Sequence, residues 1–462
     1  MIKYLLSVQK AALFAIRVSM KDSKDIQVSI IGGGLVGTLC ACILGNKGIQ
    51  VKLYEMRDDI RRTKVSHGRS MNLTLSERGM SALRLVGIKD ETIKKFTIPI
   101  RGRILHSQDS RRVPFPTDRK GRYFYSVIRK DLGEVLVAAA EKNPNIKFFY
   151  NHKFLNCCFK TGKYQVQGPN GEVIEDSADL LIGCDGAYSA VRRQMLKMSR
   201  FDYHQSYFEQ GYVELCIPPT LSGKFAMEAD YIHFWPRKEV LMTALPNNNS
   251  TYTVTLFMPF EMFEQMDTPG KLLQLFSENF PDAIPLIGKE KLITDFFNAS
   301  PNAMVSIKCN SYHVGDKVLI LGDAAHAMLP FNGQGMNAGF EDCEILAELL
   351  STYKYDLREV LPAFTKCRQK DADVVCDLAK STYNVMKLHT SKTFLLWNKV
   401  DVFLNTIFPK SWILLNSEIT FSKLKYSHCL ARKQAQDKIL SSLLWSVTII
   451  GLVFTTAMVA RL

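Results

Sequence analysis

Disulfide and metal-ligand patterns are missing from this sequence. The eleven cysteines are an odd number, and they include no C-x-x-C pair and no pair with the spacing of a zinc site. A disulfide framework or a structural zinc centre is therefore excluded as the basis of the fold, and we predict no metal ligand. We expect the cysteines to be buried free thiols in a reducing compartment.

Basic residues outnumber acidic ones, but they are spread along the chain rather than clustered. The 462 residues contain 59 Lys and Arg against 45 Asp and Glu, a net charge of +14. Such an excess is typical of proteins that bind nucleic acids, anionic membrane surfaces or acidic ligands. Because the chain has no compact basic and aromatic patch, nucleic acid is not predicted as a partner.

Each end of the chain contains a stretch without acidic residues. Residues 1–21 are basic, which fits either a mitochondrial-type presequence or a short extension. Residues 439–460 are 22 residues without a charge, long enough to cross a bilayer as a helix. They predict a C-terminal transmembrane anchor with the bulk of the chain in the cytosol, because the preceding segment is basic. A second apolar stretch, 394–412, fits either an interfacial segment or packed core.

An apolar strand runs directly into a glycine-rich turn near the N-terminus. Residues 28–37 read V-S-I-I-G-G-G-L-V-G, a G-x-G-x-x-G between a β-branched run and the start of an apolar helix. Gly32 would form the tight turn, Gly34 would let a pyrophosphate approach the backbone, and Gly37 would let the helix pack closely on the strand. The phosphates would lie at the N-terminus of this helix.

A second strand ends on an acid at the distance that a dinucleotide site requires. The strand 49–54 leads to Glu55, eighteen residues after Gly37, where a carboxylate can accept a hydrogen bond from a ribose hydroxyl. Strand, turn, helix and acid together predict a Rossmann-like unit. The sequence has no second G-x-G-x-x-G, so a nicotinamide cofactor would bind transiently, without a Rossmann domain of its own.

Two later strands also end in polar turns. The apolar strand at 179–182 leads into Asp185-Gly186, and the strand at 318–321 leads into Gly322-Asp323. Between them, 211–258 contains short alternating strands, which predict an antiparallel sheet that forms the wall of a substrate chamber. We also expect a helix at 77–86, a strand and helix at 123–140, a hairpin turn at 168–171, a loop at 330–337, a helix at 338–350 and helices over 361–438.

One expected strand carries two arginines. Pro99 to His106 alternates apolar residues with Arg101 and Arg103, so both side chains would point to one face. An arginine that projects from a strand into a pocket binds carboxylates well through its two-pronged guanidinium group. A solvated strand face is the alternative. His326, after Gly-Asp-Ala-Ala, is expected to be structural rather than a catalytic base.

Together the glycine turn with Glu55, the Asp185-Gly186 segment and Gly322-Asp323 with its loop resemble the single-component FAD-dependent aromatic hydroxylases, the para-hydroxybenzoate hydroxylase-like flavoproteins. Segments 68–73, 280–288 and 333–343 add to this likeness, which runs from about Val28 to the C-terminal apolar run. The resemblance implies an α/β fold: a Rossmann-like FAD-binding domain of the glutathione reductase type, an antiparallel substrate domain, C-terminal helices and a transmembrane helix.

This resemblance divides the chain as follows. The FAD-binding domain would comprise 26–100, 126–200 and 311–360; the substrate domain 101–125 and 201–310; the helical region 361–438; and the flanking segments 1–25 and 439–460.

The resemblance also implies the ligands of the cofactor. FAD-binding residues would be Gly32, Gly34, Val36, Gly37, Tyr54, Glu55, Met56, Arg57, Thr74, Arg129, Phe154, Asp185, Asp323, Met336 and Asn337. Amide groups of 333–337, just before a helix, could stabilise negative charge on the reduced flavin. The chemistry would belong to the cofactor, so no catalytic side chain is assigned.

The implied reaction is a hydroxylation. NADPH would reduce bound FAD, O2 would form a C4a-hydroperoxyflavin, and its distal oxygen would enter the ring of a small aromatic, amino-acid-like substrate. Arg103 would pair with the substrate carboxylate. Thr117, Thr382 and Asn416 stand where the family has other pocket residues, and Asn332 stands where animal members usually have Phe. The substrate lining would then be more polar than in the family.

Two other functions stay open at this point. One is a hydroxylase of a different aromatic or quinone ring, and the other is a prenyl-protein chaperone-like protein of this fold without redox turnover. Within that family, the animal members that segments 68–73, 280–288 and 333–343 resemble carry a C-terminal anchor and sit on the mitochondrial outer membrane, so the resemblance implies this location too.

Overall fold

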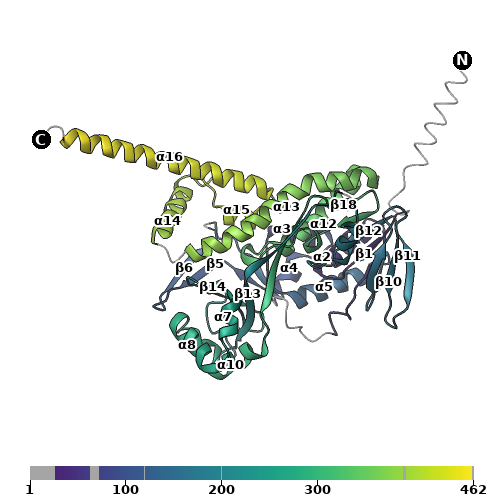
Figure 1. The fold of residues 1–462 in the computed structure, drawn as a ribbon, viewed down its shortest axis with the longest axis horizontal. Helices are drawn as coiled ribbons and strands as arrows, with labels where there is room; N and C mark the ends of the chain where they lie inside the picture. The colour runs from purple at the N-terminus through teal and green to yellow at the C-terminus, as the bar shows by residue number, and fades with distance from the viewer. Residues whose placement is uncertain (1–25, 63–71, 119, 199, 389–391, 460–462) are drawn as a thin grey trace, which may run out of the picture.

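The computed structural model describes residues 26–62, 72–118, 120–198, 200–388 and 392–459. A largely parallel sheet with helices forms one part, a larger mixed sheet forms a second, and long helices follow at the C-terminal end (Figure 1). The expected α/β fold with a second sheet and C-terminal helices is therefore confirmed.

The first sheet contains the strand that leads into the glycine turn. Its order is β18-β19-β12-β1-β2-β8, and its neighbours are parallel except for the edge pair β18–β19. The strands are β1 (Gln27–Ile31), β2 (Gln50–Tyr54), β8 (Ile146–Phe149), β12 (Leu180–Gly183), β18 (His313–Val314) and β19 (Val318–Ile320). Because α2 (Leu35–Asn46) packs between α5 (Arg129–Glu141) and α12 (Gly335–Thr352), it is apolar on nearly every side.

Two small antiparallel sheets flank this core. One has the order β11-β10-β9 and contains the expected hairpin; the other has the order β3-β7-β4. Their strands are β3 (Asn72–Leu75), β4 (Thr97–Ile100), β7 (Phe124–Ile128), β9 (Lys153–Cys157), β10 (Lys163–Gln167) and β11 (Val173–Ser177).

The substrate-domain sheet has seven strands in the order β17-β13-β16-β15-β14-β5-β6. They are β5 (Gly102–His106), β6 (Arg112–Pro116), β13 (Tyr203–Ile217), β14 (Tyr231–Pro236), β15 (Leu241–Pro246), β16 (Tyr252–Pro259) and β17 (Asn302–Cys309). The antiparallel strands expected over 211–258 are confirmed, because β13, β16, β15 and β14 pair in antiparallel fashion. Strand β5 joins this sheet from outside that range and runs parallel to β14. The strand expected at Pro99 to His106 is in fact two strands in different sheets, β4 and β5, which separate at Arg101.

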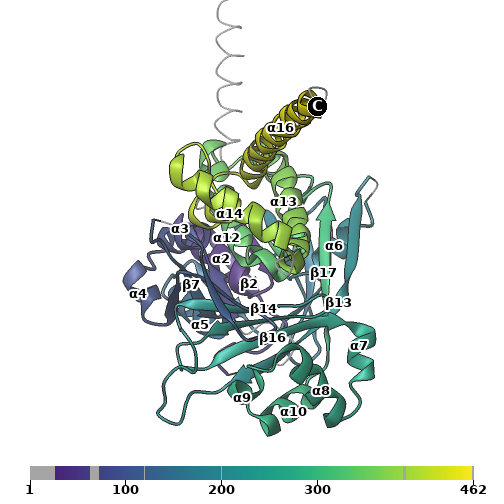
Figure 2. The same ribbon diagram turned by 90° about the vertical axis from the view of Figure 1, so that its left-hand side faces the viewer.

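The two faces of the seven-stranded sheet are covered differently. Along β14, Phe234 belongs to an apolar cluster on one face and Trp235 to a second cluster on the other, as strand alternation requires. The face with Trp235, which we call the back face, is covered by α7 (Phe260–Gln265), α8 (Pro269–Asn279), α9 (Ile284–Ile287) and α10 (Lys289–Asn298), at the bottom of Figure 2. The face with Phe234, the front face, meets α13 (Leu357–Leu388) and the loop before α12.

The remaining helices complete the structure. They are α3 (Glu77–Leu85), α4 (Asp90–Lys94), α6 (Ala190–Met195), α11 (Asp323–His326), the 3-10 turn η2 (Pro330–Asn332), α14 (Lys392–Ile407), α15 (Leu415–Phe421) and α16 (Tyr426–Val459).

The C-terminal helix α16 extends away from the body in both views (Figures 1 and 2). The anchor expected at 439–460 falls on its distal half, and 447–460 lie outside the residues whose side chains are described. Within the described part of the chain, no helix combines the length and apolar character that a membrane crossing needs.

Candidate active site

The glycine turn and Glu55 lie together, as the sequence predicts. Gly32 has a φ of +104°, and a Cβ there would stand 2.5 Å from the carbonyl oxygen of Cys184, so only glycine fits. The Gly33 amide donates to Glu55 Oε2 over 2.8 Å. By contrast, a Cβ at Gly34 would have no heavy atom within 4 Å. The backbone at Gly34, at the N-terminus of α2, therefore has room for a phosphate group.

The Gly322-Asp323 turn packs directly against the glycine turn. A Cβ on Gly322 would meet both methyl groups of Val36 at 3.3 Å. Asp342 of α12 holds this turn, because its Oδ2 accepts hydrogen bonds from the Gly322 amide over 2.9 Å and from His326 Nε2 over 2.6 Å. Burial raises the pKa of Asp342, but His326 and Arg368 outweigh this and hold it below its ordinary value. His326 is thus a partner of a buried carboxylate, as expected for a structural residue.

The loop that the resemblance assigns to the flavin ring is fixed from two sides. We call residues 330–337 the flavin loop. Asn337 donates from Nδ2 to the carbonyl oxygens of Thr74 and Gly333 over 2.8 and 2.9 Å, and its Oδ1 accepts from the Ser76 amide. Thr74 Oγ1 also donates to Gly333 over 3.0 Å. The first turn of α12 is therefore held rigidly against β3.

A cation lies within electrostatic reach of the Gly322-Asp323 turn. Arg129 opens α5; burial lowers the pKa of its guanidinium, and the negative charges of Asp323 and Glu214 oppose that shift. Asp323 in turn lies near the flavin loop, because a Cβ on Gly335 would stand 4.0 Å from its Oδ1. The structure thus brings Gly34, Glu55, Thr74, Arg129, Asp323 and Asn337 to one region at the carboxyl ends of the parallel strands, where ligands bind in such sheets.

The side chains of some other residues expected in the FAD site bond to, or pack against, other parts of the protein. Tyr54 is buried, and its hydroxyl donates to Asp176 over 3.0 Å. Asp185 caps α6, with Oδ2 accepting from the amides of Ala190 and Val191. Phe154 lies in the core of the first sheet. Any contact of these three with FAD would therefore fall to their backbone. Met56 and Arg57 are exposed just after β2.

The two arginines of the expected strand do not act together. Arg101 is exposed and pairs with Asp230 over 3.4 Å, so the expectation that it shares a face with Arg103 is wrong; the break between β4 and β5 turns it outward. Arg103 is half-buried and shares the front face with Leu105. Desolvation lowers the pKa of its guanidinium, which makes no ion pair with any residue that the structure describes.

Aromatic side chains line the front face. Phe331 of the flavin loop lies 4.7 Å from the ring of Tyr383 on α13 and 5.1 Å from that of Phe257 on β16. Phe208 packs edge-on against Tyr383 at 4.9 Å. The Tyr383 hydroxyl is buried and has no hydrogen-bond partner within the described residues. An apolar enclosure with a few unsatisfied polar groups is typical of a small-molecule site.

The three expected substrate residues lie at the edge of this region. Thr117 follows β6, and its amide donates to the Arg101 carbonyl over 2.9 Å. Asn416 is exposed on α15, whose Ser417 bonds to Asp118, the neighbour of Thr117. The Thr382 hydroxyl donates to the Leu378 carbonyl inside α13 over 2.7 Å. The chain thus brings Thr117 and Asn416 near each other, while the hydroxyl of Thr382 is occupied.

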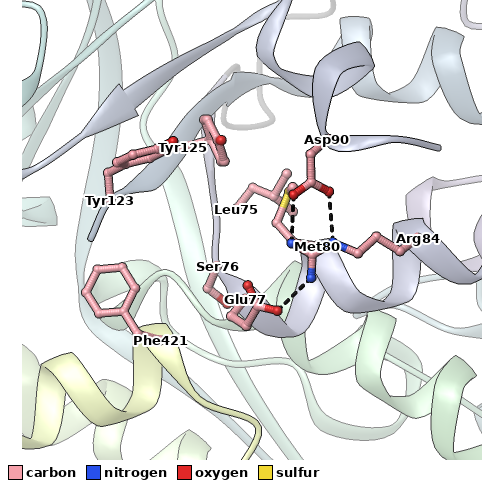
Figure 3. A pocket seen from close by; sticks show the side chains of 9 residues that line it. All are labelled: Leu75, Ser76, Glu77, Met80, Arg84, Asp90, Tyr123, Tyr125 and Phe421. Carbon is pink, nitrogen blue, oxygen red and sulfur yellow. Dashed lines mark hydrogen bonds and ion pairs between the residues drawn. The ribbon is translucent and has the colours of Figure 1, made fainter. Parts of the chain in front are cut away.

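A separate cavity of about 170 Å³ opens between α3, β7 and α15 (Figure 3). Figure 3 shows Arg84 bonded to Glu77 and Asp90 on one side, and the rings of Tyr123, Tyr125 and Phe421 on the other. Because both carboxylates already pair with Arg84, we assign this cavity no part in the FAD site.

Comparisons with known proteins agree with this geometry. The model of a family described as an FAD binding domain matches residues 25–360. Kynurenine 3-monooxygenase of Anopheles gambiae is 48% identical over 429 residues, which cover 92% of this chain and 88% of the relative. The enzyme of the same name from Sus scrofa is 43% identical, over 92% of this chain and 90% of its own length. The chain belongs to the kynurenine 3-monooxygenase family.

Members of the kynurenine 3-monooxygenase family are flavoprotein monooxygenases, so this chain binds FAD. The open backbone at Gly34 and the fixed amides of the flavin loop fit this cofactor. Solved structures show the same fold. The oxygenase of 2-methyl-3-hydroxypyridine-5-carboxylic acid has a TM-score of 0.65 at 21% identity, covering 80% of this chain and 94% of its own. Pseudomonas putida p-nitrophenol 4-monooxygenase has a TM-score of 0.62 at 19% identity, covering 78% and 89%.

Sequence reasoning missed several buried polar contacts near the site and in the substrate sheet. They are Asp342 with Arg368, Tyr426 with Gln334 and, on the back face, His106 with His233 and Asp282. The two members of each pair stand far apart in the sequence on different elements. No spacing rule could have joined them, although Asp282 and Asp342 fall in segments that carry the resemblance.

Proposed function

We propose that this protein converts L-kynurenine to 3-hydroxykynurenine, with NADPH and O2 as co-substrates. The observation that carries this proposal is Arg103, a partly buried cation without an ion-pair partner among the described residues, on the aromatic face of the substrate sheet. Such a charge is costly unless a ligand supplies the anion. The substrate named for the relatives is an aromatic amino acid, and its carboxylate would supply it.

The residues of the chain would bind and orient the reactants. When bound, FAD supplies the two-electron chemistry that activates O2. Arg103 would grip the carboxylate through two parallel hydrogen bonds and so hold the ring at a fixed distance from the cofactor. Phe331, Phe257 and Tyr383 would exclude water from the ring, which limits the loss of reducing equivalents to hydrogen peroxide. The amides that begin α12 would stabilise negative charge on the reduced cofactor.

The purified protein tests the proposal directly. NADPH consumption is measured with and without L-kynurenine, while product mass and hydrogen peroxide are followed in the same samples. We expect L-kynurenine to stimulate NADPH consumption and to yield a product one oxygen atom heavier. Stimulation by quinone-ring compounds or other aromatic acids, without any by L-kynurenine, would overturn the proposed substrate.

We also propose that residues 439–460 anchor the chain in the mitochondrial outer membrane, with the catalytic body in the cytosol. The uncharged run supports this, as do large exposed apolar side chains on α14, among them Leu396, Phe403 and Ile407. Alkaline extraction of membranes from cells that make the full chain or residues 1–438 is the test. The full chain should stay with outer-membrane markers, and the shortened chain should be released.

A further inference from the structure

The base of α16 reaches the flavin loop through the side chain of Tyr426. Tyr426, the first residue of α16, is fully buried, and its hydroxyl donates to Gln334 Oε1 over 3.0 Å. Gln334 is 2% exposed and belongs to the flavin loop. The backbone carbonyl of Gln334 accepts a hydrogen bond from the Ala338 amide over 2.7 Å, which is the first bond of the α12 helix. A bond to this side chain therefore fixes the point where α12 begins.

Two arginines hold the Tyr426 ring in place. The guanidinium carbon of Arg78 lies 3.9 Å from the ring centroid, and that of Arg368 lies at 5.9 Å. Both arginines pair with Glu341 on α12, so the ring packs against a charge cluster that is itself tied to α12. Burial raises the pKa of the Tyr426 phenol above its ordinary value, which keeps the hydroxyl protonated as a donor.

The backbone around Tyr426 is also tied down. Arg78 donates to the carbonyl oxygen of Leu424, two residues before it. Asp371 of α13 accepts from both the amide and the hydroxyl of Ser427, over 2.8 and 2.9 Å. Since the backbone before and after Tyr426 is fixed, the phenol meets Gln334 in one position. Any displacement of the base of α16 would reach the flavin loop through this contact.

We infer that Tyr426 is a positioning residue for the flavin site: through Gln334 it sets the start of α12 and couples the base of α16 to the loop that faces the flavin. The inference rests on the proposed function only where turnover is measured. It makes α16 part of the active-site architecture, whatever the distal half of that helix contacts.

The test compares Tyr426→Phe with Tyr252→Phe in the full-length protein. Tyr252 is a matched control, because it is also fully buried and its hydroxyl donates to the Met227 carbonyl over 2.7 Å, on the back face of the substrate sheet. Each variant loses one buried hydrogen bond and keeps its ring. Amide hydrogen exchange of 330–340 is followed in the apo and FAD-bound forms, together with the FAD dissociation constant and the peroxide formed per NADPH.

We expect Tyr426→Phe to speed exchange at 330–340 by about fivefold to tenfold, the effect of losing one buried hydrogen bond. The FAD dissociation constant and the peroxide fraction should rise with it, while Tyr252→Phe should leave all three unchanged. Equal effects of the two variants on exchange would overturn the inference. Faster exchange in a protein that never turns over L-kynurenine would overturn the proposed function alone.

Two further variants, Gln334→Met and the double variant with Tyr426→Phe, test the coupling if Tyr426→Phe alone folds poorly. Gln334→Met removes the acceptor while keeping the side-chain length. If the phenol acts through Gln334, the double variant should exchange no faster at 330–340 than Tyr426→Phe alone. Additive effects in the double variant would show that the two side chains act independently and would overturn the proposed coupling.

Discussion

The two faces of the seven-stranded sheet differ in whether their polar side chains have hydrogen-bond partners. On the back face, His106 Nδ1 bonds to Asp282 over 2.6 Å, His106 Nε2 meets His233 over 3.0 Å, and Trp235 donates to Asp282. On the front face, Arg103 and the Tyr383 hydroxyl have no such partners among the described residues. Satisfied polar groups stabilise a fold, whereas unsatisfied ones mark the place where a ligand completes the network. The polar side chains named on the back face are thus satisfied within the chain, whereas Arg103 and the Tyr383 hydroxyl remain available to a ligand.

Arg103→Ala should have the largest effect, because it removes the unpaired charge of the front face. We expect the Michaelis constant for L-kynurenine to rise roughly 10²- to 10³-fold, the cost of losing a buried charged hydrogen bond. Stability should not fall, since no protein ion pair is lost. Steady-state kinetics and thermal unfolding measure both effects. Arg101→Ala is the control, as Arg101 is exposed; an equal loss in that variant would remove the distinction between the two arginines.

Low pH should reduce the stability of the fold through the buried histidines of the back face. Burial, helped by His106 and Arg112, lowers the pKa of His233 to about 3. A histidine with a depressed pKa stabilises the fold above its unfolded pKa of about 6.5, and that stability is lost as the pH falls. The free energy of unfolding should thus decline from pH 6.5 downward, and His233→Gln should flatten the slope by up to about 1.4 kcal/mol per pH unit.

Denaturant titrations at a series of pH values provide this measurement. His428→Gln, at an exposed position on α16, serves as the control and should leave the slope unchanged. A slope that is the same in the wild-type protein and in His233→Gln would show that His233 does not cause the pH dependence.

In the first sheet, two glycines of the same turn have different roles. Gly34→Ala should leave the stability of the apo form within about 0.5 kcal/mol, because its φ of −70° suits any residue and its Cβ meets nothing. The FAD dissociation constant should nevertheless rise about tenfold or more, since the methyl group occupies the space for the phosphate. Gly37→Ala should instead destabilise the apo form, because its Cβ would stand 1.9 Å from the Gly32 carbonyl oxygen. Calorimetry and FAD fluorescence titrations distinguish the two roles.

Tyr54→Phe should have the smallest effect. Its hydroxyl bonds to Asp176 and Tyr164 in the core, so its loss should cost about 1 kcal/mol of stability and leave FAD affinity unchanged. A large loss of affinity would show that the Tyr54 side chain reaches the cofactor after all. The same titrations as for Gly34→Ala provide the answer.

Local patterns predicted most of the first sheet. The apolar runs and the turn residues that follow them placed β1, β2, β12 and β19 correctly, because each strand is short and ends near a glycine or an acidic residue. The same patterns could not separate β4 from β5, since nothing between Ile100 and Gly102 interrupts the apolar alternation. The parallel pairing of β5 with β14 was equally hidden, because register between distant strands leaves no local signal.

Site prediction followed the same division. Motifs at Gly32, Glu55 and Gly322 lie in single turns and were found, and the structure brings them together. The resemblance pointed to Tyr54 and Asp185, but it could not show that their side chains are occupied by Asp176 and by α6. Contacts between distant elements, such as Tyr426 with Gln334, depend on tertiary packing and could be found only in the structure.

The parallel pair β5–β14 has a consequence for biosynthesis. Strand β5, which carries Arg103, is made early, but its neighbour β14 follows only after β7 to β13 have been translated. Until then, β5 has only the hairpin partner β6, and two strands alone are marginally stable in water. The part of the sheet that carries Arg103 therefore assembles late, and the nascent chain must keep an unfinished sheet edge from aggregating while the intervening strands are translated.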